Sequence, residues 1–186
     1  VDLENLMPSQ GIRIAGASEY DFSGYVVSGG GDVNGDGFSD VFIGAPGTDD
    51  GRRAYVIYGR GDIGNLDLGT ITSADGFSIF DSNGDFQARS ISIAGDVNGD
   101  GIDDLIVDAS GADPEGRFEA GASFVVYGTM DLPTEIDLAT LTSAQGFKVI
   151  GAASWDHLGH AVSGAGDVDG DGFADLAISA LYPDPE

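Results

Sequence analysis

A threefold internal repeat constrains this chain more than any other feature, because the copies of a repeat adopt the same local fold. One heptapeptide, Gly-Asp-Val-Asn/Asp-Gly-Asp-Gly, stands at residues 31–37, 95–101 and 166–172. Successive copies begin 64 and 71 residues apart, and the likeness extends into the apolar segments on both sides. Such a repeat indicates stacked supersecondary units that share a continuous core.

Each repeat predicts four β-strands. Short runs of small and β-branched residues precede the heptapeptides, and continuous apolar runs, typical of strands buried on both faces, follow them. The preceding runs are residues 25–29, 90–94 and 160–164, and the following runs are residues 41–43, 105–107 and 176–178. A third strand is expected in residues 54–59 and 123–128, which are rich in β-forming residues, and a fourth in residues 11–14, 76–79 and 146–149. Residues 66–74 and 136–144 could each hold a helical turn, but no amphipathic helix is visible.

Four strands per repeat, separated by turns rich in Gly and Asp, predict an all-β chain made of four-stranded antiparallel β-propeller blades. We expect residues 1–15 to be the outer strand of a preceding blade, residues 16–81 and 82–151 to be two blades, and residues 152–186 to be a partial blade. About two and a half blades and one N-terminal outer strand are fewer than the four to eight of a closed propeller. We therefore expect a larger protein, self-association or a second chain to complete the ring.

The chain is strongly acidic, with 32 Asp and Glu residues against 7 Lys and Arg residues and a formal net charge of −25. A polyanion is repelled by nucleic acid and by anionic membrane surfaces, so neither is an expected partner. The chain has no cysteine and only two histidines, which argues against disulfides, zinc sites and Cys/His nucleophiles. No apolar run reaches the roughly 20 residues of a membrane-spanning helix, so no membrane insertion is expected.

The heptapeptides begin loops that present oxygen atoms at alternate positions. Counting from the first aspartate, positions 1, 3, 5 and 9 carry carboxylate or amide side chains. Position 7 is apolar, so we expect its backbone carbonyl to be the ligand and its side chain to anchor the loop in the core. The predicted metal ligands are Asp32, Asn34, Asp36, Phe38 and Asp40; Asp96, Asn98, Asp100, Ile102 and Asp104; and Asp167, Asp169, Asp171, Phe173 and Asp175. Glycine at position 6 permits a sharp turn, as in an EF-hand loop, although the acid here falls at position 9 rather than 12.

Calcium is the ion that these loops predict, at one site per loop. Ca²⁺ accepts six to eight oxygen ligands, whereas Mg²⁺ demands stricter octahedral geometry and fewer protein ligands. The alternative is that Asn-Gly and Asp-Gly are hairpin turn residues, but a hairpin needs only one such dipeptide and no converging carboxylates. Three Ca²⁺ ions would change the net charge from −25 to −19. The third loop has four carboxylates against three in each of the others, so we expect it to bind most tightly.

These residues resemble the FG-GAP repeats of the integrin α-chain β-propeller and its bacterial relatives. The Asp-x-Asn/Asp-x-Asp-Gly-x-x-Asp loop is the most specific element of the resemblance, which covers nearly the whole chain. The Gly-Ala-Pro motif stands intact only at residues 44–46, and the Phe-Gly motif survives loosely at residues 23–24, 87–88 and 158–159. These departures favour a divergent bacterial member and weaken any inference of integrin-like ligand specificity.

The resemblance implies two faces. Calcium would lie on the face of the loops that join strands 1–2 and 3–4, and a protein or glycan ligand would bind the face of the strand 2–3 and 4–1 loops. The residues expected on that ligand face are Tyr20, Phe22, Arg52, Arg53, Phe86, Trp155, His157 and Tyr182. The expected function is that of a non-catalytic calcium-binding module of a secreted or cell-surface protein, acting in adhesion, ligand binding or assembly.

An alternative function is the body or an accessory domain of a secreted enzyme that acts on polysaccharide or lipid. Polar residues unique to one repeat and gathered on the ligand face would favour it, but no such set is visible, and no catalytic residue is predicted. Trp155, His157 and His160 are interpreted as packing residues. Asp21, Asp85 and Asp156, which recur in step, are interpreted as turn or inter-blade residues. The tripeptide at residues 60–62, Arg-Gly-Asp, is one that integrins recognise, but three common residues in a turn are a weak signal.

Overall fold

The computed structural model describes residues 6–7, 10–47, 51–131 and 133–182. Within them the chain is all-β, apart from three single 3-10 turns. Parts of the expected outer strand and of the partial blade, residues 1–5, 8–9 and 183–186, lie outside the described residues, as do residues 48–50 and 132. The all-β blades of a partial propeller that the sequence predicts are confirmed.

The first sheet contains β2 (Val26–Gly31), β3 (Asp40–Ala45), β4 (Arg53–Ile57) and β6 (Gly76–Phe80). These four strands are antiparallel neighbours in that order, as expected for a blade. The apolar run of β3 forms because it is buried on both faces, with Phe42 and Ile43 packing into different hydrophobic clusters.

The second sheet repeats this arrangement with β7 (Ile91–Gly95), β8 (Asp104–Ala109), β9 (Ala122–Val126) and β11 (Gly146–Ile150). Every residue of β8 and β9 is buried. The third copy contributes an antiparallel pair, β12 (Val162–Gly166) and β13 (Asp175–Ile178).

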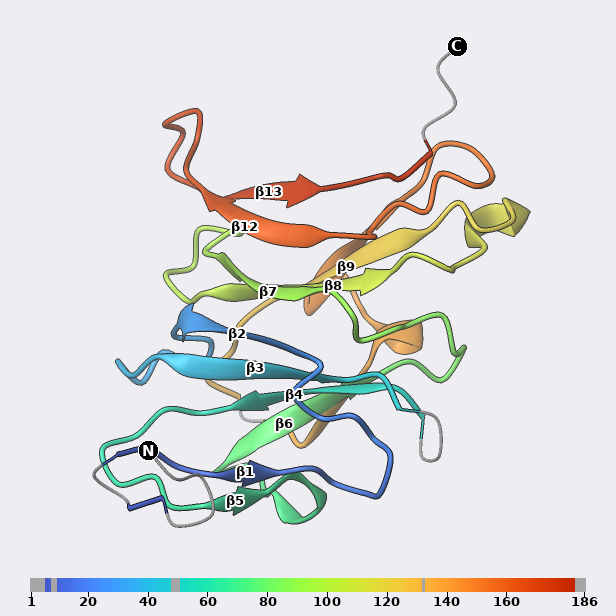
Figure 1. Cartoon of the computed structure of the whole chain (residues 1–186). Coiled ribbons are helices and arrows are strands. Elements are labelled where there is room, and N and C mark those ends of the chain that lie inside the picture. The colour runs from blue at the N-terminus through green and yellow to red at the C-terminus, as the bar shows by residue number, and fades with distance from the viewer. Residues whose placement is uncertain (1–5, 8–9, 48–50, 132, 183–186) are drawn as a thin grey trace.

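The sheets stack face to face (Figure 1). Hydrophobic clusters join neighbouring sheets. The largest cluster joins Phe42, Val56 and Phe77 of the first sheet to Leu105 and Phe124 of the second. Two smaller clusters lie above and below it, one against β12 and β13 and one against β1 (Ile14–Ala15). Each blade therefore depends on its neighbours for burial of its faces, as in other repeat folds.

Two short strands that the sequence did not indicate link neighbouring blades. β5 (Leu66–Asp67) pairs in parallel with β1, and β10 (Glu135–Asp137) pairs in parallel with β6 of the first blade. Each leads into one of the predicted helical turns, the 3-10 turns η2 (Leu68–Thr70) and η4 (Leu138–Thr140). In the second repeat, the segment between the third and fourth strands therefore adds a strand to the β6 edge of the first sheet.

Candidate metal centre

The acidic loops join the first two strands of each blade, and each begins at a β-bulge. The register shifts between Gly29 and Gly31, between Ile93 and Gly95, and between Gly164 and Gly166. A bulge bends its strand, and here it turns the chain from the ladder into the loop. Gly30 and Gly95 have φ values of 110° and 81°, a backbone conformation that favours glycine.

The aspartate at position 1 organises each loop through its two carboxylate oxygens. Asp32 Oδ1 accepts from the N–H of Asp36 at 3.0 Å, and Asp32 Oδ2 accepts from Gly37 N–H at 2.7 Å. Asp96 and Asp167 accept from the same positions of their own loops. The shared pattern curls all three loops in the same way, and the oxygens retain lone pairs that a cation could use.

The aspartate at position 9 lies at the base of the loop. Asp40 accepts from Val33 N–H and from Gly59 N–H, both at 2.8 Å, and Asp104 accepts from the corresponding amides at 2.9 Å. Both side chains are almost fully buried. Burial, with nearby loop aspartates adding to it, raises the pKa of Asp40 and raises that of Asp104 to about 6. A cation beside such a carboxylate favours its ionised form and would offset the cost of burial.

The third loop holds the closest group of carboxylates. Oxygens of Asp167, Asp169 and Asp175 all lie within 4.8 Å of one another. One calcium ion with Ca–O distances of 2.3–2.6 Å can contact oxygens up to about 5 Å apart, so this donor set fits calcium. Positions 1, 3 and 9 thus converge here, whereas position 5, Asp171, lies outside the group. In the first two loops position 3 is an asparagine, and its amide oxygen accepts from the N–H of position 5.

The residues at position 7 do not anchor their loops in a blade core, contrary to the prediction. Phe38 and Phe173 are about half exposed, and Ile102 is also partly exposed. Ile102 instead lies beside Gly35 of the preceding loop, where an added methyl group would be 3.7 Å from Ile102 Cδ1. A methyl group added to Gly99 would be 2.5 Å from Phe173 Cε1, so the ring would have to shift to admit it.

The repeat pattern does not identify two carboxylates, Asp103 and Asp108, because neither recurs in the other repeats. Asp103, at position 8, contacts the preceding loop, and its counterparts are Ser39 and Ala174. Asp108 stands in the buried run of β8, where the first repeat has Gly44, and accepts from the N–H groups of Arg89 and Ser90. Its burial raises its pKa to about 6. A carboxylate inside an apolar strand is the signal that identifies Asp108.

The opposite face presents an aromatic cluster built on two neighbouring repeats. Phe118 and Trp155 pack edge to face with ring centroids 4.7 Å apart, and His157 lies next to Trp155 and Tyr182. His157 Nε2 is 3.5 Å from Glu119 Oε2. Trp155 remains 55% exposed, so its interpretation as a packing residue holds only in part. Phe86, which was expected on this face, is buried.

Asp21 and Asp156 have the turn role that was predicted, whereas Asp85 does not. Asp21 accepts from Ala17, Ser18 and Ser23, and these hydrogen bonds outweigh burial and lower its pKa. Asp156 accepts from Ala153 N–H. In the second repeat the turn is held by Asp81, which accepts from Asp85 N–H.

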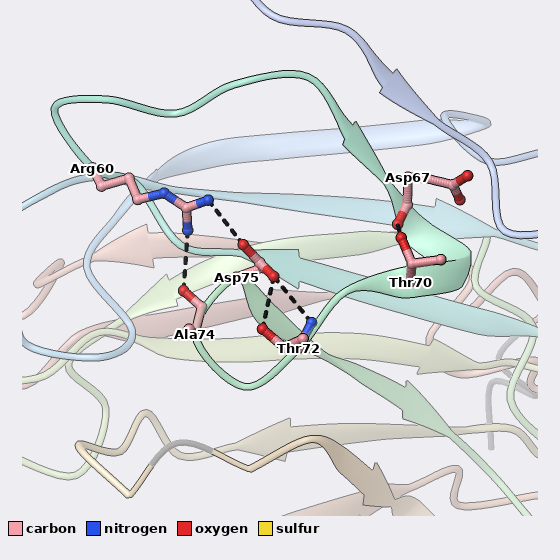
Figure 2. Close-up of polar contacts among 6 residues, drawn as sticks. All are labelled: Arg60, Asp67, Thr70, Thr72, Ala74 and Asp75. Atoms are coloured by element: carbon pink, nitrogen blue, oxygen red, sulfur yellow. Dashed lines mark hydrogen bonds and ion pairs between the residues drawn. The ribbon is translucent and has the colours of Figure 1, made fainter.

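The guanidinium of Arg60 folds back onto its own strand 3–4 loop (Figure 2). It donates to the carbonyl of Ala74 at 3.0 Å and forms an ion pair with Asp75 at 2.8 Å. Asp75 also accepts from the N–H and the hydroxyl of Thr72. The arginine of the Arg-Gly-Asp tripeptide is therefore engaged within the chain, which argues against its presentation to a receptor.

Comparison with protein families gives a match to the FG-GAP repeat model at residues 23–62, 88–126 and 158–184. Each matched segment includes one of the acidic loops. Among curated proteins, the chain is 34% identical to integrin alpha-PS2 of Drosophila melanogaster, over 82% of the chain and 11% of that protein. It is 29% identical to integrin alpha pat-2 of Caenorhabditis elegans, over 90% of the chain and 13% of that protein.

The chain is also similar to a second kind of curated protein. The chain is 33% identical to phosphatidylinositol-glycan-specific phospholipase D of Rattus norvegicus, over 81% of the chain and 18% of that protein. The chain thus spans less than a fifth of each of these relatives. Within the described residues, no helix is long and apolar enough to span a bilayer.

Proposed function

The chain belongs to the FG-GAP repeat family, and on that premise we propose that it is a calcium-binding propeller module, with one ion held by each acidic loop. The ligands are the side chains at positions 1, 3, 5 and 9 and the backbone carbonyl at position 7. The observation that carries this proposal is the convergence of Asp167, Asp169 and Asp175 within 4.8 Å, in a loop whose hydrogen bonds recur in the other two copies.

Calcium acts here as a structural staple. The position 1 aspartates tie each loop to itself, and in the first two loops the position 9 aspartate also ties the loop to the end of the third strand, so an ion among them stabilises the folded blades. An ion that binds only the folded state adds about 2.7 kcal/mol per site at a free concentration of 100 times Kd. Without a cation the clustered carboxylates repel one another, so removing calcium should also destabilise the folded loops through this repulsion.

The test is thermal unfolding with calcium and with EDTA. Because three sites contribute and 1 kcal/mol shifts Tm by roughly 2–4 °C in a chain of this size, EDTA should lower Tm by about 10 °C or more. Returning calcium should restore Tm, whereas magnesium at equal concentration should restore much less. An unchanged melting curve in EDTA would refute the stabilising role.

We place the biological ligand, a protein or a glycan, on the face of the strand 2–3 and 4–1 loops of a secreted or cell-surface protein. Support comes from the exposed aromatic side chains on this face: Tyr20, Phe22, Phe118, Trp155 and Tyr182. Tyr20, Phe22, Trp155 and His157 also have positive φ values, and strained backbone of this kind gathers at binding sites. Completion of the ring by another copy or another chain is part of the same proposal.

A second candidate function is a domain of an enzyme that acts on lipid or polysaccharide. The observation that favours it is the similarity to phosphatidylinositol-glycan-specific phospholipase D. A glycan array read with and without calcium, combined with product analysis, separates the two functions. Calcium-dependent binding without product supports the non-catalytic module, and product formation supports the enzyme.

A further inference from the structure

We propose that the calcium loops are coupled in series, and that Asp103 of the second loop is a positioning residue for the calcium site of the first. This inference rests on the proposed function, because it concerns how neighbouring calcium sites influence one another. It assigns a role to a carboxylate that is not among the predicted ligands and has no acidic counterpart in the other repeats.

The first step is a two-sided contact between the loops. Asp32 N–H donates to Asp103 Oδ2 at 2.8 Å, and Asp103 N–H donates to the Asp32 carbonyl at 3.0 Å. The backbone on both sides of Asp32 Cα is therefore fixed by a residue of the next blade. Asp32 is the position 1 ligand, whose carboxylate organises the first loop. Displacing its backbone would displace the whole oxygen set.

The second step is that residues 102–104 serve both loops at once. In the second loop, the Ile102 carbonyl and the Asp104 carboxylate are the position 7 and 9 ligands. Toward the first loop, the same segment presents the Ile102 side chain beside Gly35 and the Asp103 carboxylate beneath Asp32. An ion in the second loop orders this segment, and the ordered segment holds the first loop in its binding shape.

The junction between the third and second loops is similar but lacks the carboxylate. Ala174 N–H donates to the Asp96 carbonyl at 2.8 Å, and the Phe173 ring covers Gly99. Alanine at position 8 has no side-chain acceptor for Asp96 N–H. The two junctions of one chain therefore provide an internal comparison, with and without the side-chain contact.

The coupling must act in both directions, because the effect of one site on the affinity of another is reciprocal. Filling the second loop raises the affinity of the first, and filling the first raises the affinity of the second by the same factor. Emptying the first loop with Asp36→Ala should therefore weaken calcium binding at the second loop, with no change in any ligand of that loop.

The experiment is a calcium titration of the full chain followed by NMR, with the amide signals of Gly37, Gly101 and Gly172 reporting the three loops separately. Asp103→Ala keeps the backbone N–H contact and removes the carboxylate. We expect the affinity of the first loop to fall roughly three- to tenfold, the effect of losing one hydrogen bond. The affinity of the second loop, to which Asp103 belongs, should change less than that of the first.

Two further variants separate positioning from general destabilisation. Asp103→Asn retains an oxygen that can accept from Asp32 N–H, and it should recover most of the affinity of the first loop. Ala174→Asp places a carboxylate where Asp96 N–H can reach it and should strengthen the second loop. A loss confined to the second loop in Asp103→Ala, or three unchanged affinities, would overturn the coupling.

The same titration distinguishes failure of the proposed calcium function from failure of the coupling between loops. If none of the three glycine signals responds to calcium in the unmodified chain, the proposed calcium function fails. If all three respond and Asp103→Ala leaves the first loop unaffected, only the coupling fails.

Discussion

At the scale of single residues, position 3 is the proposed ligand position at which the acidic loops differ in charge. It is Asn34 in the first loop, Asn98 in the second and Asp169 in the third. The third loop is also the one whose carboxylates converge within 4.8 Å. Because calcium affinity depends on the number of charged ligands, this single difference should make the third site bind more tightly than the other two.

We predict that Asp169→Asn weakens calcium binding at the third loop by about one order of magnitude. The substitution gives the third loop the same position 3 residue as the others, so no new shape is introduced. Isothermal titration calorimetry should show that the tightest of the three sites is lost and that the three sites then have similar affinities. The reverse change, Asn98→Asp, should create a second tight site, and equal affinities before and after both changes would contradict this ranking.

Asp108 predicts a pH dependence that does not involve a calcium ligand. Its pKa is raised from 3.8 to about 6 by burial, so the folded state keeps the proton over a range in which the unfolded chain has lost it. Stability therefore falls as pH rises through about 4 to 6, and the loss reaches about 3 kcal/mol at pH 7. Asp108→Asn removes this titration.

The measurement is the free energy of unfolding in saturating calcium for both proteins. Between pH 4 and 7, we expect Asp108→Asn to gain up to about 3 kcal/mol relative to the unmodified chain. Taking the difference between the two proteins cancels the acid sensitivity of the calcium loops. A constant difference across this pH range would show that Asp108 ionises normally.

At the scale of elements, the glycine that follows the third strand couples a blade to its acidic loop. Gly128 N–H donates to Asp104 Oδ1, and an added Cβ would lie 2.3 Å from the Asp103 carbonyl and 2.9 Å from the Val33 carbonyl. Gly59 occupies the same place in the first blade, against the Ser39 carbonyl. These obstacles are backbone atoms, which cannot move aside as the end of a side chain can.

We predict that Gly128→Ala destabilises the chain by about 2 kcal/mol or more, because overpacking against backbone forces strands apart. Tm should fall by roughly 4–8 °C in saturating calcium. Gly61→Ala is the matched control, since no heavy atom lies within 4 Å of its added Cβ. Equal melting temperatures for the two variants would show that the blade accommodates a methyl group at Gly128.

The elements that could be read from the sequence are those with a repeated local pattern. Apolar runs such as residues 105–107 became the buried strands, and the acidic loops fall at the expected junctions. β5 and β10 could not be predicted, because residues such as Leu66 pair with a distant strand rather than forming a periodic run. The prediction that the position 7 side chains lie in the core was wrong for the same reason. Ile102 packs on the preceding loop, and this contact cannot be read from one repeat alone.

At the scale of the whole molecule, the stacked blades leave the first and third loops with unequal surroundings. Ile102 and Phe173 each lie against a glycine of the preceding loop, whereas Phe38 has no preceding acidic loop among the described residues to contact. Among the described residues, no heavy atom lies within 4 Å of a Cβ added to Gly170. By analogy with the two internal junctions, we expect the position 7 residue of a following blade, from the same protein or from another copy, to cover Gly170.

We predict that an isolated polypeptide of residues 1–186 self-associates in calcium through this contact, which would give a mass that is a multiple of 19.0 kDa. Phe38→Ala should weaken the association without removing a side-chain calcium ligand. Phe118→Ala, which changes a similarly exposed ring on the opposite face, should not. Sedimentation velocity reports both, and a monomer at all concentrations would contradict ring completion by a second copy.

Calcium in all three acidic loops is the claim on which the other expectations depend, and a crystal structure of the chain grown in calcium tests it most directly. The account predicts one ion in each loop, contacted by oxygens of positions 1, 3, 5 and 9 and by the carbonyl of position 7. Loops that hold only water or sodium under those conditions would contradict it.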